Sequence, residues 1–496
     1  MLTFYKENWF NNIKGDLLSG IVVALALIPE AIAFSIIAGL DPKVGLYASF
    51  SICVVIAFTG SRSGMISAST GAMALLMTTL VKQHGVEYLL AASVFTGVLQ
   101  YGIGLLKLGD LMRFISRSIV TGFVNALAIL IFMAQLPELT NVTWHVYALT
   151  ACGLGIIYLF PYVPKIGKLL PSPLVCIVAV TIFSVIFKVD VRTVGDMGSL
   201  PDSLPIFLLP KVPLSFETLQ IIFPYSLALA VVGVLESLMT AKIIDDITDT
   251  PSNNNDECKG QGIANIVSGF FGGMAGCAMI GQSMINMNSG GRTRLSTLSS
   301  GVFLLIMVVF LGDYLKQIPM AALVAVMIMV SISTFSWKSI LDIRHHPLNS
   351  NVIMIATVIS VVMTHNLAIG VIIGVVISTV FYANHSRKIM KVTDDVVIHN
   401  EHTIHKVHGQ IFFASAYNFI DMFNFNHPTK YVTIDLTDAH FWDITAVGAL
   451  DKVIIKFMNA GADVDIIGMN EESDKLISKF AIFDKPDLLA SRTIGH

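Results

Sequence analysis

Two apolar stretches, ALALIPEAIAF at residues 24–34 and ALAVVGVLESLMTAK at residues 228–242, each enclose a single acidic residue. The acids are Glu30 and Glu236, and aligning them places ALALIPEAIA on AVVGVLESLM. An ionised carboxylate in hydrocarbon is costly unless it is paired or neutralised. The matched stretches therefore predict a duplicated membrane element in which each acid has a function.

The composition of the chain is that of a membrane protein. Of its 496 residues, 54% are hydrophobic and only 13% are charged, whereas soluble domains carry about 25% charged residues. Apolar runs at 21–28, 127–133 and 352–363 are typical of membrane-spanning helices. Too few polar residues are present to coat so many helices in water, which argues against a large soluble protein.

Fourteen segments between residues 16 and 383 are apolar enough to be predicted as spans. Their approximate centres are Ala26, Val54, Ala74, Phe95, Ala126, Gly155, Val178, Leu229, Ile266, Met284, Phe303, Ala325, Ile355 and Gly374. The third and tenth are short and rich in Gly, Ser and Thr. Residues 1–389 are thus predicted to form a membrane domain. Residues 392–496, with charges and short alternating runs, are predicted to form a soluble one.

The loops between the predicted spans differ in charge. Most Lys and Arg residues lie in the loops on the side of the N-terminus, which predicts that both termini are cytoplasmic. The Pro-rich loop at 190–216 divides the spans into seven and seven. An odd-numbered repeat inserts upside down relative to its copy, so residues 16–189 and 217–388 are predicted to form an inverted repeat, a transporter architecture.

The short third and tenth segments predict an anion site. A segment that is first extended and then helical exposes its first N–H groups, which bind anions together with the helix dipole. Two such helix starts facing each other would hold one small anion. The candidate residues are Ser69, Thr70, Gly71, Gly281, Gln282 and Ser283. The alternative is that both segments are ordinary small-residue packing faces.

The two glutamates are candidate coupling groups. Pro29 can loosen the helix just before Glu30, and Phe34 lies one turn later on the same face. Glu236 shares a face with Thr240 in the same way. A carboxylate beside an anion site repels the anion unless a proton or a cation neutralises it, although a purely structural carboxyl–hydroxyl contact remains an alternative.

Five cysteines are scattered along the chain, at Cys53, Cys152, Cys176, Cys258 and Cys277. Their spacing predicts neither a disulfide framework nor a metal site. We interpret them as packing residues.

These residues resemble the SulP sulfate permease family of anion transporters. The resemblance rests on IPEAIAFSIIAGLDPKVGLYASF, ESLMTAK, GQGIANIVSGFFGG, NMNSGGRTRLS and the C-terminal region. It implies a core domain and a gate domain that move in an elevator-like way, with the anion between the third and tenth spans. Carried over by position, the anion-binding residues are Phe34, Ser69, Thr70, Gly71, Ala72, Gly281, Gln282 and Ser283.

The resemblance also bears on the coupling ion. Many eukaryotic relatives have Gln at the position of Glu30, and some have Arg at that of Gln282. Here a titratable acid replaces a fixed positive charge, which favours proton coupling. Sodium-coupled bicarbonate relatives have an acid and a hydroxyl where Glu236 and Thr240 stand, so sodium at this pair remains an alternative.

The C-terminal region resembles a STAS domain, with strands KVHGQIFFAS, KYVTIDLTD and ADVDIIGM and a helix from about Thr445. In bacterial anti-sigma antagonists the equivalent loop reads Asp-Ser-Ser-Gly and its first Ser is phosphorylated. Asp443 matches, but Ile444 occupies the acceptor position. We therefore expect a packing or dimer-stabilising role rather than regulation by that phosphorylation.

The sequence thus predicts an α-helical polytopic transporter with an α/β STAS domain, and no enzyme. It would carry a small anion (sulfate-like, bicarbonate or dicarboxylate) across the inner membrane, coupled to protons. Sodium–bicarbonate symport, an uncoupled anion channel and a membrane-tethered signalling protein are the alternatives. The expected partners are the anion, membrane lipid and a second copy in a homodimer, with no nucleic acid. No cofactor is expected beyond the coupling ion.

Overall fold

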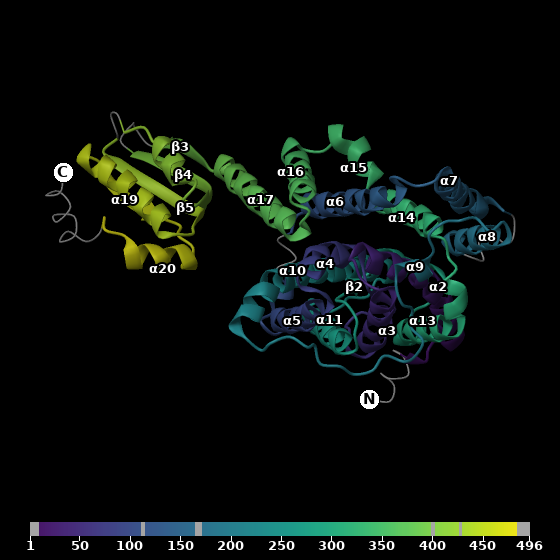
Figure 1. The fold of residues 1–496 in the computed structure, drawn as a ribbon. Coiled ribbons are helices and arrows are strands. Elements are labelled where there is room, and N and C mark those ends of the chain that lie inside the picture. The colour runs from purple at the N-terminus through teal and green to yellow at the C-terminus, as the bar shows by residue number, and fades with distance from the viewer. Residues whose placement is uncertain (1–8, 111–114, 164–170, 398–401, 426–428, 484–496) are drawn as a thin grey trace. The chain divides into compact units, whose positions relative to one another are not determined.

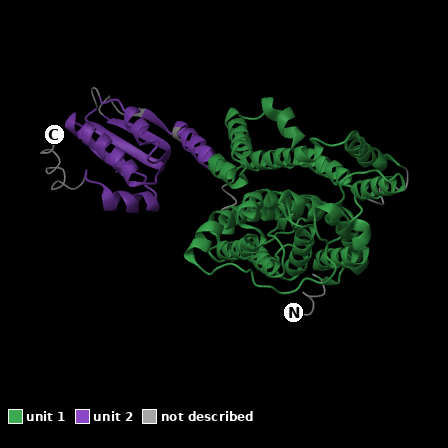
Figure 2. Cartoon of the chain, viewed as in Figure 1, with its two compact units in different colours: residues 1–375 green, residues 376–496 purple. Residues whose placement is uncertain are grey.

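A computed structural model describes residues 9–110, 115–163, 171–397, 402–425 and 429–483. The chain forms two compact units, residues 1–375 and 376–496 (Figure 2). Helix α17 (Leu367–Ile389) contains the boundary between them.

The first unit is helical, and its elements occur twice in the same order (Figure 1). Each half begins with two helices, continues with a two-residue strand and a short helix, and ends with further helices. The first half comprises α2 (Ile13–Ile37), α3 (Pro42–Thr59), β1 (Ser67–Ala68), α4 (Gly71–His84), α5 (Val86–Leu105), α6 (Arg117–Gln135), η2 (Leu136–Leu139), α7 (Trp144–Leu159), η3 (Phe160–Tyr162) and α8 (Ser172–Ile186).

After the short connecting helix α9 (Val194–Met197), the second half follows the same plan. It comprises α10 (Phe216–Thr248), α11 (Asn254–Phe270), β2 (Cys277–Ala278), α12 (Ile280–Asn288), α13 (Arg294–Leu315), α14 (Met320–Thr334), α15 (Trp337–Leu341), η4 (Asp342–Arg344), α16 (Leu348–Thr364) and α17.

Every predicted span centre lies in a helix, but the predicted number of spans is not confirmed. Within the described residues, eight helices are long and apolar enough to cross a membrane, or nine if α14 and the bent segment after it count as one. Helices α8 and α16 are apolar but shorter. Helices α4 and α12 have only 14 and 9 residues because a strand replaces their first turns.

Local sequence explains where several of these helices begin. Pro42 occupies the first turn of α3, where its missing N–H costs nothing. Ser215, Asn253 and Thr293 cap α10, α11 and α13 by accepting backbone N–H groups. Pro29 lies inside α2 without ending it, so the expected loosening before Glu30 does not break the helix.

Helices α5 and α11 pack with their backbones in near contact. A Cβ atom on Gly97 would lie 2.4 Å from the carbonyl oxygen of Gly262, and one on Gly262 would lie 2.6 Å from that of Gly97. Only glycine permits this approach. The contact fixes α11, which in turn holds the strand β2.

The second unit contains a four-stranded sheet in the order β3-β4-β5-β6. Its elements are β3 (Lys391–Val397), β4 (His402–Ile411), α18 (Ala416–Asp421), β5 (Tyr431–Phe441), α19 (Ile444–Asn459), β6 (Asp463–Ile467) and α20 (Glu471–Phe480). Strand β3 is antiparallel to β4, whereas the β4–β5 and β5–β6 pairs are parallel.

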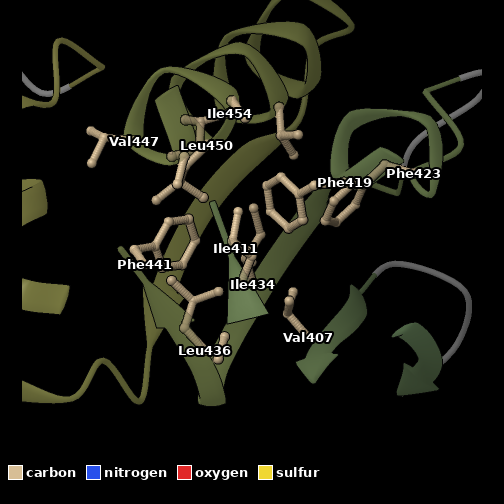
Figure 3. Packing of buried hydrophobic residues seen from close by; sticks show 14 of the residues in the cluster. Val407, Ile411, Phe419, Phe423, Ile434, Leu436, Phe441, Val447, Leu450 and Ile454 are labelled. Atoms are coloured by element: carbon tan, nitrogen blue, oxygen red, sulfur yellow. The ribbon is translucent and has the colours of Figure 1, made fainter. Parts of the chain in front are cut away.

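A core of aliphatic and aromatic side chains lies between this sheet and its helices (Figure 3). Ile411 and Ile434 from the sheet are fully buried, as are Phe419 of α18 and Leu450 of α19. Asp443 caps α19 by accepting the N–H of Ala446, and it also accepts that of Phe413. Ile444, at the position expected for a phosphoacceptor, is exposed.

Candidate anion-binding site

The strands β1 and β2 bring the third and tenth predicted segments together. They pair antiparallel, with Ser67 opposite Ala278 and Ala68 opposite Cys277, and all four residues are buried. The N–H of Met279 extends the pairing by donating to the carbonyl of Ile66. Each segment is thus first extended and then helical, and the starts of α4 and α12 follow directly from the paired strands.

Helix α11 holds the strand pair through two buried amides. Gln261 donates to the hydroxyl of Ser67 in β1 at 2.6 Å. Asn265 both accepts the N–H of Gly276 and donates to its carbonyl, just before β2. Both residues belong to the stretch GQGIANIVSGFFGG, which carries part of the family resemblance, and here they position the site. No periodicity or spacing marks them in a single sequence.

The two half-helices begin differently. Thr70 precedes α4 and accepts the N–H of Met73 through its hydroxyl at 3.4 Å. Met279 precedes α12 and has no side chain that can cap it. The first backbone bond of α12 runs from the N–H of Ser283 to the carbonyl of Met279. The preceding N–H groups, including those of Gly281 and Gln282, have no acceptor within the helix.

A cavity of about 240 Å³ lies at these helix starts. Seven predicted residues line it, namely Glu30, Phe34, Thr70, Gly71, Glu236, Gly281 and Gln282. Helices α6 and α14 contribute a mostly apolar wall, which includes Phe123, Leu127, Ile131, Met329 and Val330. Residues at the start of α8 also line the cavity. The sequence does not single out these wall residues, because apolar residues of this kind occur in every predicted span. Among the described lining residues there is no Lys, Arg or His.

Glu30 of α2 is the more open of the two acids. It is half-buried, lines the cavity, and its carboxyl group interacts with the side-chain amide of Gln282 at the start of α12. Gln282 is itself only 3% exposed. An acid from the first half thus contacts the half-helix of the second half.

Glu236 of α10 is held by a thiol. The Sγ of Cys277 donates to its Oε2 at 2.9 Å, and the hydroxyl of Thr70 lies 3.2 Å from the same Sγ. All three side chains are buried. The acid of the second half thereby connects through β2 to the N-cap of α4. Our interpretation of Cys277 as a mere packing residue was wrong, because a thiol placed between a carboxylate and a hydroxyl has a polar role.

Four predicted residues lie outside the cavity lining, namely Ser69, Ala72, Ser283 and Thr240. Ser69 bonds the hydroxyl of Ser49 and the carbonyl of Gly45, and Ala72 is fully buried. The hydroxyl of Ser283 accepts the N–H of Ile66.

The hydroxyl of Thr240 bonds the backbone of its own helix. It donates to the backbone carbonyl of Glu236, one turn earlier in α10, at 2.8 Å. Thr240 thus bonds the backbone of Glu236 rather than its carboxyl group, unlike the structural carboxyl–hydroxyl contact that was considered as the alternative. Together with Ser69, Ala72 and Ser283, Thr240 shapes the frame around the cavity rather than its surface.

Comparison with known proteins identifies the fold and the family. Residues 13–152 and 137–357 match the Sulfate permease family, and residues 393–493 match the STAS domain. A Bacillus subtilis protein described as "Putative sulfate transporter YbaR" is 53% identical over 96% of this chain and 98% of its own length. "Bicarbonate transporter BicA" of Synechocystis is 26% identical over 96% of this chain and 91% of its own.

Solved structures agree with this assignment. The transmembrane domain of a cyanobacterial bicarbonate transporter, BicA, covers 74% of this chain and 99% of its own, with a TM-score of 0.66 and 27% identity. The murine anion transporter Solute Carrier 26 family member A9, in its inward-facing state, covers 98% and 90%, with a TM-score of 0.81. Its 17% identity supports the fold alone.

The predictions of a helical membrane transporter, of a C-terminal STAS domain and of a protein that is not an enzyme are therefore confirmed. The chain belongs to the sulfate permease family of anion transporters.

Proposed function

We propose that this protein is a secondary active transporter that carries a small anion across the inner membrane together with protons. The observation that carries the proposal is the cavity in which an uncapped helix start and two acids, one from each half, lie together. Its membrane domain would span residues 1–389, with the STAS domain at 392–496 in the cytoplasm and the protein acting as a homodimer.

Backbone groups are the proposed anion ligands. Because the described lining residues include no basic side chain, we assign the positive potential to the N-termini of α4 and α12. Gly281 leaves the backbone of α12 accessible, since a Cβ atom there would meet nothing within 4 Å. A cavity of about 240 Å³ is smaller than pockets for drug-sized ligands, which run from about 300 to 1,000 Å³, and suits an inorganic ion or a very small carboxylate.

Glu30 is the proposed coupling acid that faces the anion. An ionised Glu30 would repel an anion held at α12 in a medium of low dielectric constant. A proton on Glu30 removes that repulsion and lets the carboxyl group donate a hydrogen bond. Anion and proton would therefore enter together and leave together. Glu236 would act from the other half, through the contact with Cys277 and Thr70.

The apolar wall suggests how the site moves. Helices α6 and α14 are joined by a hydrogen bond from Ser331 to the carbonyl of Ala128 at 2.7 Å, so they can act as one gate body. The side chains of Leu127, Ile131 and Val330 on this wall are apolar, so they offer no hydrogen-bonding group that would resist sliding. We propose that α2, α4, α10 and α12 carry the anion past this wall in an elevator-like motion.

Sodium–bicarbonate symport is retained as the alternative because similarity to bicarbonate transporters covers most of the chain. It would require Thr240 to turn from the carbonyl of Glu236 toward its carboxyl group. The similarity to proteins described as sulfate transporters makes sulfate-like anions the first substrates to test.

Uptake into proteoliposomes tests these proposals. We would measure initial rates for sulfate, bicarbonate and a dicarboxylate under an inward proton gradient, an inward sodium gradient or neither. We expect accumulation of one anion class with the proton gradient alone. Accumulation only with sodium would favour sodium–bicarbonate symport. An internal anion concentration that never exceeds its electrochemical equilibrium value under any gradient would indicate a channel.

A further inference from the structure

A second cavity, of about 380 Å³, shares no lining residue with the anion site. It is enclosed by the start of α6, the segment formed by α15 and η4, and the start of α16. Its lining includes Arg117, Thr121, Lys338, Asp342 and His346. The charge pattern of the loops places Arg117 and Lys338 on the cytoplasmic side.

Two of these cations are available for a ligand. Arg117 and Lys338 are exposed, and neither forms an ion pair within the described part of the chain. A guanidinium and an ammonium across one cavity are suited to a phosphate group, which the guanidinium can bind through two N–H groups. Asp342 on the same cavity limits how much negative charge the site tolerates.

Hydrogen bonds from two buried asparagines hold the cavity in shape. Asn125 of α6 accepts the N–H of Ser336 and donates to the hydroxyl of Ser339 in α15. Asn351 of α16 donates to the carbonyl of Ile343. These contacts join α6, the segment of α15 and η4, and α16 around one cavity. The backbone positions that carry Arg117 and Lys338 are therefore held relative to each other.

The outer face of α15 is apolar. Trp337, Ile340 and Leu341 follow helical spacing, and 56%, 49% and 76% of their surfaces are exposed. The indole N–H of Trp337 donates to the carbonyl of Ile332, which fixes the ring. Leu348, at the start of α16, is 81% exposed. A tryptophan beside exposed aliphatic groups and cations is typical of the membrane–water interface.

We propose that this cavity binds the headgroup of an anionic phospholipid whose acyl chains lie over the apolar face of α15. The phosphodiester, with one negative charge, would contact Arg117 and Lys338. Asp342 would accept a hydrogen bond from a hydroxyl group of the headgroup, as in phosphatidylglycerol. The same carboxylate disfavours doubly charged inorganic phosphate, so the structure favours a lipid over a free ion.

Thermal unfolding of the full-length protein in a neutral detergent tests the site. Phosphatidylglycerol, phosphatidylcholine and inorganic phosphate would be titrated separately. We expect phosphatidylglycerol alone to raise the unfolding temperature. In Arg117→Gln/Lys338→Gln the lipid concentration for half the effect should rise about tenfold or more, since hydrogen bonds to charged groups are lost. Lys107→Gln, which removes another exposed cation on the predicted cytoplasmic side, is the matched control.

Three results would overturn the proposal. They are an equal lipid effect in the double variant and in wild type, an equal loss in Lys107→Gln, or a phosphate effect as large as that of the lipid. If the double variant unfolds at a lower temperature before lipid is added, the two single variants carry the same test, each with a smaller expected change.

Discussion

The starts of α4 and α12 occupy equivalent places in the two halves but are built differently. Thr70 caps α4, and a Cβ atom on Gly71 would lie 2.9 Å from Phe34 and 3.1 Å from Ile131. Met279 leaves α12 uncapped, and Gly281 faces open space. One half-helix start is closed by protein and the other is open. A repeat can therefore keep its backbone plan while one helix start is crowded by neighbouring side chains and the other faces open space.

The two acids repeat this contrast. Glu236 is 8% exposed and already accepts a hydrogen bond from Cys277, whereas Glu30 is half-buried at the cavity beside Gln282. The side of the cavity near α12 thus holds both the free helix start and the more open acid. We infer that α12 binds the anion more strongly than α4 does.

Replacing Gly71 tests the closed side and should have the largest effect. Gly71→Val places a branched side chain against Phe34 and Ile131, and overpacking of about 1–3 kcal/mol would lower uptake roughly 5- to 150-fold. Gly281→Ala, whose Cβ meets open space, should retain most of the uptake. Initial rates in proteoliposomes would measure both. Equal losses would show that the two helix starts are equally crowded during transport.

Removing the proposed coupling acid should have the next largest effect. Glu30→Gln resembles a permanently neutral carboxyl group, so it should still bind the anion but no longer accumulate it on a proton gradient. Glu236→Gln should slow transport with and without the gradient, because it disturbs the contact with Cys277. Gradient-driven accumulation that survives in Glu30→Gln would exclude Glu30 as the coupling acid.

Adding a charge to the open helix start sharpens the comparison further. Gln282→Arg places a cation beside Glu30 and the first N–H groups of α12. We expect anion affinity to rise about tenfold, which corresponds to about 1.4 kcal/mol. This increase should remain at alkaline pH. Isothermal titration calorimetry would measure this. An unchanged dissociation constant at high pH would place the anion elsewhere.

Ser283→Ala should have the smallest effect on the anion. Its hydroxyl accepts the N–H of the fully buried Ile66 at 3.0 Å, so the variant leaves that N–H without its partner. The cost should be about 1–3 kcal/mol of stability, seen as a lower unfolding temperature. Anion affinity should stay within about twofold of wild type, since less than about 0.5 kcal/mol is involved. A large loss of affinity would mean that Ser283 binds the anion directly.

Sequence reasoning found the half-helices because an extended, Gly- and Ser-rich segment that turns helical is visible in a single chain. It also found both acids, since a carboxylate in an apolar run stands out. It missed Cys277, Gln261 and Asn265, because their roles depend on contacts between segments far apart in the chain. Ser69, Ser283 and Thr240 were predicted from residue type, and in this structure their hydroxyls bond the frame around the cavity.

The most direct test of the account is the pH dependence of anion binding in wild type and Glu30→Gln. If the anion lies between α12 and Glu30, raising the pH ionises Glu30 and places a negative charge beside it. Wild-type affinity should therefore fall as the pH rises, and Glu30→Gln should hold its affinity over the same range. The same fall in both proteins would contradict the account, because the proton that matters for binding would then lie on another group.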